Sequence, residues 1–189
     1  SNGRMQNLRD AAKEFVTTML RSENKDLVSI SLIPYSEHVN AGPLLFDKMN
    51  VDKVHDYSHC IEFDSADFNT SSYDSTHTYD QMQFFQWNDG TRYNNDLTEP
   101  VCPRYSYERI TAFSQNKSAL HAQIDSLSPR AGTSIFLGMK WGVALLDPSF
   151  NAINTGLVGE GVVDPIFVSR PAAYSDNETL KTVILMTDG

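Results

Sequence analysis

The sequence lacks an excess of positive charge and lacks any long hydrophobic run. Fifteen Lys and Arg residues stand against twenty-four Asp and Glu, which gives a net charge of −9. The electrostatic field of such a chain repels nucleic-acid phosphates and anionic lipid headgroups. No segment approaches the ~18 consecutive apolar residues of a membrane span. We therefore expect no nucleic-acid partner and no membrane-spanning helix within this chain.

Signatures of common catalytic sites are also missing. The sequence contains no Gly-x-Ser-x-Gly elbow, no His-Glu-x-x-His motif and no Gly-rich phosphate-binding loop. We therefore predict that the protein is not an enzyme. Cysteine is scarce as well, because only Cys60 and Cys102 occur, and two thiols are too few to indicate a redox compartment by their number.

The composition does provide enough apolar residues for one folded domain. Hydrophobic residues make up 40% of the chain and charged residues 21%, values that are typical of globular proteins. A compact domain of this size buries roughly 70% of the surface that its unfolded chain exposes. We predict a single domain that spans residues 1–189.

The spacing of apolar residues predicts three helices and three strands. Steps of three and four residues between apolar side chains indicate helices, and Asn116 is placed to cap the second of them. A continuous apolar run near the end is typical of a strand buried on both faces of a parallel sheet. The helices are expected over 5–20, 117–127 and 134–146, and the strands over 27–33, 109–113 and 182–186.

Two irregular stretches, at about 36–107 and 149–178, interrupt this pattern, and we interpret both as insertions that pack on the α/β unit. The first contains a predicted hairpin with an Asp89-Gly90 turn. It also contains many aromatic residues, which either build a small core or form a surface that binds sugar or protein. These aromatics are Tyr73, Tyr79, Phe84, Phe85, Trp87, Tyr93, Tyr105 and Tyr107.

The order of the predicted elements carries a resemblance. A helix and a strand come first, a Gly132-Thr133-Ser134 loop precedes a later helix, and the last strand ends in Thr187-Asp188-Gly189. This arrangement resembles a von Willebrand factor A domain, in which an Asp-x-Ser-x-Ser loop, a Thr and a later Asp hold a divalent cation. The resemblance implies an α/β, Rossmann-like open sheet flanked by helices, with Thr133 and Asp188 as metal ligands.

The Asp-x-Ser-x-Ser loop of that family has no counterpart here, because only Ser1-Asn2-Gly3 precede the first predicted helix. The sequence also stops at Gly189, before the family's last strands and helices. We therefore expect a domain that is incomplete at both ends. One hydroxyl and one carboxylate carry too little charge to offset the dehydration of Mg²⁺. We expect Mg²⁺, Mn²⁺ or Ca²⁺ in the complete domain, and weak or no binding by these 189 residues.

Three further segments, Pro34-Tyr35-Ser36, Val39-Asn40-Ala41-Gly42 and 138–148, resemble the TadG-like proteins of bacterial Tad/Flp pilus assembly. The resemblance implies a non-enzymatic adhesion or assembly module outside the cytoplasm, in the periplasm or at the cell surface. It also implies a membrane anchor that lies outside this chain, and a protein partner from the pilus or cell-envelope machinery that binds through the cation. The alternative function is a carbohydrate-binding surface on the aromatic-rich insertion, with the α/β unit as its scaffold.

The two cysteines are consistent with a location outside the cytoplasm, where disulfides form. Cys60 and Cys102 both lie in the first insertion. A bond between them would lower the conformational entropy of the unfolded chain and so stabilise the fold by roughly 4 kcal/mol. We predict that they form a disulfide. Two alternatives stay open, namely free thiols and a metal cluster in which His55 and His59 join the cysteines.

Overall fold

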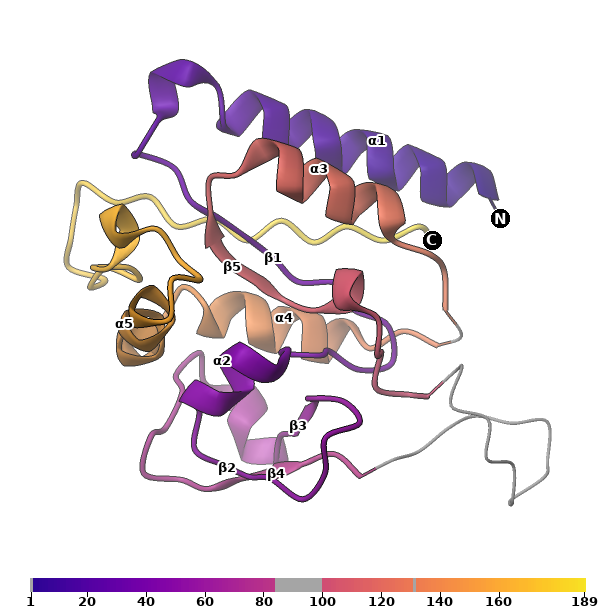
Figure 1. Ribbon diagram of the computed structural model, residues 1–189, viewed down its shortest axis with the longest axis vertical. Coiled ribbons are helices and arrows are strands. Elements are labelled where there is room, and N and C mark those ends of the chain that lie inside the picture. The colour runs from indigo at the N-terminus through magenta and orange to yellow at the C-terminus, as the bar shows by residue number, and fades with distance from the viewer. Residues whose placement is uncertain (1, 84–99, 131) are drawn as a thin grey trace.

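The computed structural model of the protein describes residues 2–83, 100–130 and 132–189, and it has a mixed α/β fold (Figure 1). The predicted α/β class is confirmed at this coarse level. The α-helices of the described residues are α1 (Asn2–Met19), α2 (Pro43–Lys48), α3 (Lys117–Ser126), α4 (Ile135–Ala144) and α5 (Asn151–Gly159). The strands are β1 (Ile30–Leu32), β2 (Val51–Asp52), β3 (Ile61–Glu62), β4 (Tyr79–Gln81) and β5 (Thr111–Ser114).

These strands form two small sheets. β1 and β5 pair antiparallel, with Ile30 opposite Ser114 and Leu32 opposite Thr111. In the second sheet β4 lies in the middle, parallel to β2 and antiparallel to β3. The second sheet lies wholly within the first predicted insertion, so this stretch has regular structure of its own.

The β1–β5 ribbon separates two layers of apolar packing. On one side, Val16 of α1 and Leu120 and Ile124 of α3 pack against Ile30 and Leu32 of β1. The main core lies on the other side and includes the buried faces of α2, α4 and α5. Figure 1 shows this arrangement, with α1 and α3 together above the ribbon and the other helices below it.

Local sequence signals explain where α3 and α4 begin. The Asn116 side chain accepts a hydrogen bond from the Ala119 N–H at 3.0 Å and caps α3 as predicted. Ser134 caps α4 in the same way, accepting from the Leu137 N–H at 3.3 Å. All three predicted helices are present, with ends that differ from the expected ones by a few residues. No helix in the described part of the chain is long and apolar enough to cross a lipid bilayer.

Several aromatic residues of the first insertion belong to the main core. Tyr73 and Tyr79 are buried and stack with their ring centroids 5.5 Å apart. Phe63 lies edge-on to Tyr79 and to Trp141 of α4, at centroid distances of 5.8 and 5.5 Å. The core interpretation of the aromatics therefore holds for these residues.

The other aromatic residues that the sequence analysis named in the first insertion fall into two groups. Tyr105 is 49% exposed and stacks on Tyr107 at a centroid distance of 5.5 Å. Phe84, Phe85, Trp87 and Tyr93, together with the predicted Asp89-Gly90 turn, lie outside the described residues.

The sequence predicts that the second insertion is irregular throughout. This prediction is wrong, because residues 151–159 form α5. This helix buries Ile153 and Leu157 in the main core. Asn154 is fully buried, and its Nδ2 donates to the carbonyls of Phe167 and Arg170, at 2.8 Å each. Packing and these hydrogen bonds outweigh the weak helix propensity of a segment rich in Asn and Gly.

The prediction of a buried strand over 182–186 is wrong. The segment is extended, but it pairs with no strand of the described residues. Val183, Ile184 and Leu185 are 37%, 47% and 43% exposed. A strand requires a neighbour for its backbone N–H and C=O groups, and the described part of the chain supplies none. Figure 1 shows the segment as the yellow trace that runs to the C-terminus.

Candidate functional site

A cavity of about 250 Å³ lies between β1 and the C-terminal segment, and we call it the central cavity. β1 and residues 33–36 form one wall, and residues 183–188 form another. Side chains of α1 and α3 close it from one side, while residues 128–130, Gly132, Thr133 and α4 close it from the other. The cavity therefore lies where the regular elements of the α/β unit meet.

The two predicted metal ligands, Thr133 and Asp188, both line the central cavity. Thr133 lies in the loop that leads into α4, and Asp188 follows the extended segment 182–186. The fold thus places two oxygen-bearing side chains that are far apart in the sequence on the lining of one cavity. Their role as metal ligands stays a prediction.

Ser36 is a further hydroxyl at this cavity that the sequence analysis did not select as a ligand. It is 8% exposed, and its Oγ has no hydrogen-bond partner among the described residues. Its backbone carbonyl accepts a hydrogen bond from the Ser134 N–H at 2.6 Å, which joins the loop after β1 to the start of α4. A buried hydroxyl without a partner is uncommon, so Ser36 has an unused oxygen next to the Thr133 loop. The sequence offered only one signal, a hydroxyl just after the proline that ends a strand.

Tyr35 ties the C-terminal segment to β1. Its hydroxyl donates to the Met186 carbonyl at 2.9 Å. Burial raises the pKa of the Tyr35 hydroxyl, a hydrogen bond with the Thr187 side chain opposes this rise, and the negative charge of Asp188 adds to it. Gly138 of α4 leaves room for the ring, since a Cβ there would lie 3.0 Å from the Tyr35 Cγ. Tyr35 therefore positions Thr187 and Asp188 at the cavity.

Glu37 brings a second carboxylate to this region. Gly132 has a φ of +74°, and a Cβ at this position would overlap the Glu37 carboxyl group. Both the backbone conformation and the close approach of Glu37 require glycine here. The Glu37 carboxyl group therefore packs directly against the residue before Thr133.

A buried ion pair fixes the other end of the Thr133 loop. Arg130 Nη1 lies 3.4 Å from Glu108 Oε2, and both side chains are largely buried. Arg130 also donates from Nη2 to the Pro100 carbonyl at 2.6 Å, and Glu108 accepts from the Tyr105 N–H at 3.2 Å. These bonds satisfy the pair, as burial of charge requires, and they connect the end of the first insertion to the cavity wall.

The oxygen atoms at the central cavity are of the type that a hard cation binds, but they carry too little negative charge to hold one. Hydroxyl and carboxylate oxygens such as those of Ser36, Thr133 and Asp188 are the ligands that Mg²⁺ takes in proteins. Within residues 2–83, 100–130 and 132–189, however, no group of three or more His, Cys, Asp or Glu side chains could hold a metal ion. These residues could supply part of a magnesium site, and further negative charge would be needed to complete it.

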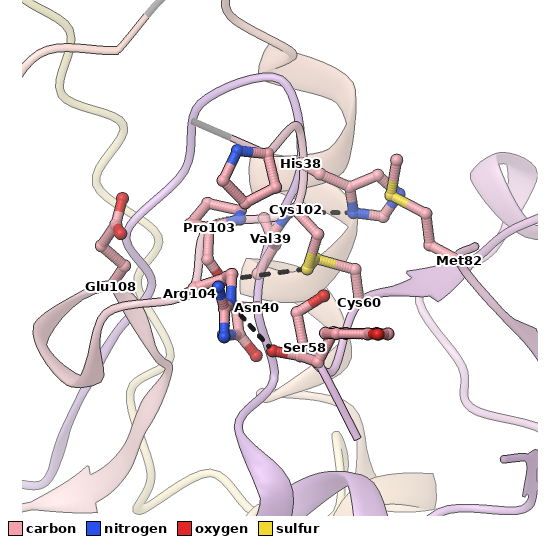
Figure 2. Close-up of a disulfide and its surroundings, with 12 residues drawn as sticks. His38, Val39, Asn40, Ser58, Cys60, Met82, Cys102, Pro103, Arg104 and Glu108 are labelled. Carbon is pink, nitrogen blue, oxygen red and sulfur yellow. Dashed lines mark hydrogen bonds between the residues drawn. A yellow bond between two sulfur atoms is a disulfide. The ribbon is translucent and has the colours of Figure 1, made fainter. Parts of the chain in front are cut away.

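The predicted disulfide is present, and it joins Cys60 to Cys102 with a Cα–Cα distance of 5.9 Å (Figure 2). Both cysteines are buried. Asn40 lies beside the bond, pairs with Cys60 in a β-bridge, and donates from Nδ2 to the Pro103 carbonyl at 2.7 Å. The disulfide and Asn40 together hold the start and the end of the first insertion against each other.

The alternative of a metal cluster at His55, His59 and the cysteines is not supported. The disulfide leaves neither cysteine free as a ligand. The His55 Nε2 lies 2.7 Å from the Met82 carbonyl, and the His59 ring packs edge-on against Phe46 at a centroid distance of 5.0 Å. Burial lowers the pKa of His59, and the positive charges of Lys53 and Arg109 lower it further. His59 is thus a buried histidine whose surroundings favour the neutral form of its ring.

Comparison of the chain with protein-family models, with curated proteins and with solved structures found no match.

Proposed function

We propose that the protein is a non-enzymatic adhesion or assembly module that binds a protein partner through a divalent cation at the central cavity. Thr133 and Asp188 are the proposed ligands from this chain, and an acidic side chain of the partner would take an open coordination position. The observation that carries the proposal is that these two side chains line the same cavity as the buried Ser36 hydroxyl, which has no hydrogen-bond partner among the described residues. A hard cation that keeps several waters can accept such a carboxylate.

We further propose that the finer fold is von Willebrand A-like. Supporting this, β1 has a paired neighbour on one edge only, and the segment 182–186 has none among the described residues. Both line the central cavity. In the family that the sequence resembles, a strand bearing Asp-x-Ser-x-Ser leads into the first helix. A strand placed between β1 and 182–186 would pair with both and would bring the missing carboxylate and hydroxyls to Thr133 and Asp188.

The disulfide supports a location outside the cytoplasm. Structural disulfides persist in oxidising compartments and are rare where thioredoxin and glutathione keep thiols reduced. Periplasmic or cell-surface exposure, a membrane anchor outside this chain, and a place in Tad/Flp pilus assembly are part of the same proposal. They rest on the TadG-like segments of the sequence together with the Cys60–Cys102 bond.

Binding to bacterial envelope proteins and to a glycan array, with Mg²⁺ or with EDTA, tests this function. For a longer chain in which an Asp-x-Ser-x-Ser segment precedes residue 1, the proposal predicts protein binding that EDTA abolishes and that Asp188→Ala weakens at least tenfold, while Asp176→Ala, which changes an exposed carboxylate away from the cavity, has no effect. Glycan binding that survives EDTA and the Asp188→Ala change would overturn it in favour of the aromatic-rich insertion as the binding surface.

A further inference from the structure

A second cavity, of about 320 Å³, lies beside β5, and we call it the Arg109 cleft. β5, the start of α2 and the end of α5 line it. Its size is at the lower end of the range for small-molecule sites, roughly 300–1,000 Å³. It shares no lining residue with the central cavity within the described part of the chain, so it is independent of the function proposed above.

Arg109 is a cation of this cleft that forms no ion pair within the described part of the chain. Its Nε is buried and has no hydrogen-bond partner, and no ion pair of its side chain occurs among the described residues. Its aliphatic stem lies across Gly42, where a Cβ would approach the Arg109 Cδ to 3.3 Å. An unsatisfied guanidinium N–H is costly to bury.

The rest of the cleft is mainly apolar and includes exposed aliphatic side chains. Leu44 is 50% exposed and Val162 is 44% exposed, and Leu157, which also lines the cleft, is buried. Asp164 also lines the cleft, where it accepts a hydrogen bond from the Ile166 N–H at 3.0 Å. The cleft therefore combines one available cation, an aliphatic wall and one fixed negative charge.

We propose that the Arg109 cleft binds a small aliphatic carboxylate, with its carboxylate on the Arg109 guanidinium and its hydrocarbon chain against Leu44, Leu157 and Val162. The planar guanidinium fork matches a carboxylate with two parallel hydrogen bonds. A single cation together with Asp164 favours a ligand with one negative charge over a doubly charged phosphate. The aliphatic body adds affinity through the apolar surface that it buries.

Calorimetric titration with sodium octanoate tests this site, with 1-octanol as the uncharged probe of the same length. Four chains are compared: the wild type, Arg109→Gln, Leu44→Glu, and the control Arg21→Gln, which changes an exposed arginine outside the cleft. Leu44→Glu places a negative charge at a half-exposed position, so it tests the site even where Arg109→Gln fails to fold. Circular dichroism establishes which variants fold.

Octanoate should bind the wild type and Arg21→Gln alike. It should bind Arg109→Gln and Leu44→Glu about tenfold or more weakly, and octanol should bind the wild type about tenfold more weakly than octanoate. The proposal is overturned by octanoate affinity that is unchanged in both cleft variants, by equal affinity for octanol and octanoate, or by no binding to the folded wild type.

Discussion

Asp147 is the residue with the most strongly perturbed acidity in the described part of the protein. It is 7% exposed and caps the turn before α5. Its Oδ1 accepts from the Ser149 N–H and hydroxyl at 3.0 and 2.6 Å, and its Oδ2 accepts from Ser71 and Tyr174 at 2.6 and 2.8 Å. Burial alone would raise the pKa of Asp147, but these hydrogen bonds lower it to about 2.

This pKa predicts how stability depends on pH. Because the folded-state pKa lies below the ordinary value of 3.8, ionised Asp147 stabilises the fold by about 2 kcal/mol above pH 4. That stability is lost as the pH falls from about 4 towards 2. Urea unfolding at pH 7 should show Asp147→Asn to be less stable than the wild type by about this amount, with the difference shrinking near pH 2.

The exposed Asp47, whose side chain is 75% accessible, supplies the matched control for that experiment. Asp47→Asn should change the free energy of unfolding by less than about 0.5 kcal/mol. An Asp147→Asn protein as stable as the wild type at pH 7 would show that the hydrogen bonds around this carboxylate do not favour its charged form.

Asp188 and Ser36 differ in whether the sequence alone could predict their place at the central cavity. Asp188 could be selected because it follows an apolar run, the position at which ligands gather in α/β sheets. Ser36 could not be selected as a ligand, since its position just after the proline that ends a strand does not by itself indicate one. Its unpartnered hydroxyl depends on how the loop after β1 meets the start of α4, and that is a contact between distant segments.

At the scale of elements, the extended segment 182–186 is expected to be the least protected part of the α/β unit. Its backbone makes no backbone–backbone hydrogen bond with the described residues. Hydrogen exchange followed by mass spectrometry should show the amides of 183–186 exchanging far faster than those of α3 and β5, because exposed unpaired amides need no opening step. Equal protection of 183–186 and β5 would contradict the unpaired state of this segment.

Elements differ in how much of them the sequence could predict. α1 and α3 follow from apolar periodicity and, in α3, from a cap that acts within four residues, so local information is enough. α5 was missed because Gly156 and its Asn residues suggest a loop, and the helix owes its stability to burial in the main core. The prediction of a strand at 182–186 is wrong because a strand needs a neighbouring strand to pair with, and a local sequence pattern does not show whether one is present.

For the whole molecule, the main core predicts that the first insertion does not fold by itself. Phe46, Ile61 and Tyr79 of the insertion share this core with Trp141 and Phe150, which come from later in the chain. Residues 36–107 expressed alone would expose the surface that those later residues cover, and so would lose much of their apolar burial. We expect no cooperative thermal transition from this fragment by circular dichroism, whereas the full chain should show one.

A cooperative transition of the fragment, with its disulfide intact, would identify 36–107 as a domain and would contradict the single-domain prediction. The Cys60–Cys102 bond is present in both proteins, so the comparison isolates the contribution of the shared core.

The central claim of the proposed function concerns the whole site: we propose that Thr133 and Asp188 bind a divalent cation only when further oxygen ligands join them. Calorimetric titration with Mg²⁺ and Mn²⁺ tests it most directly. We predict weak or no binding by these 189 residues, and much tighter binding by a longer chain in which an Asp-x-Ser-x-Ser segment precedes residue 1. Asp188→Ala in the longer chain should abolish that gain. Equal affinity of the two chains, or an Asp188→Ala variant that binds as tightly as its parent, would contradict the assignment of this site.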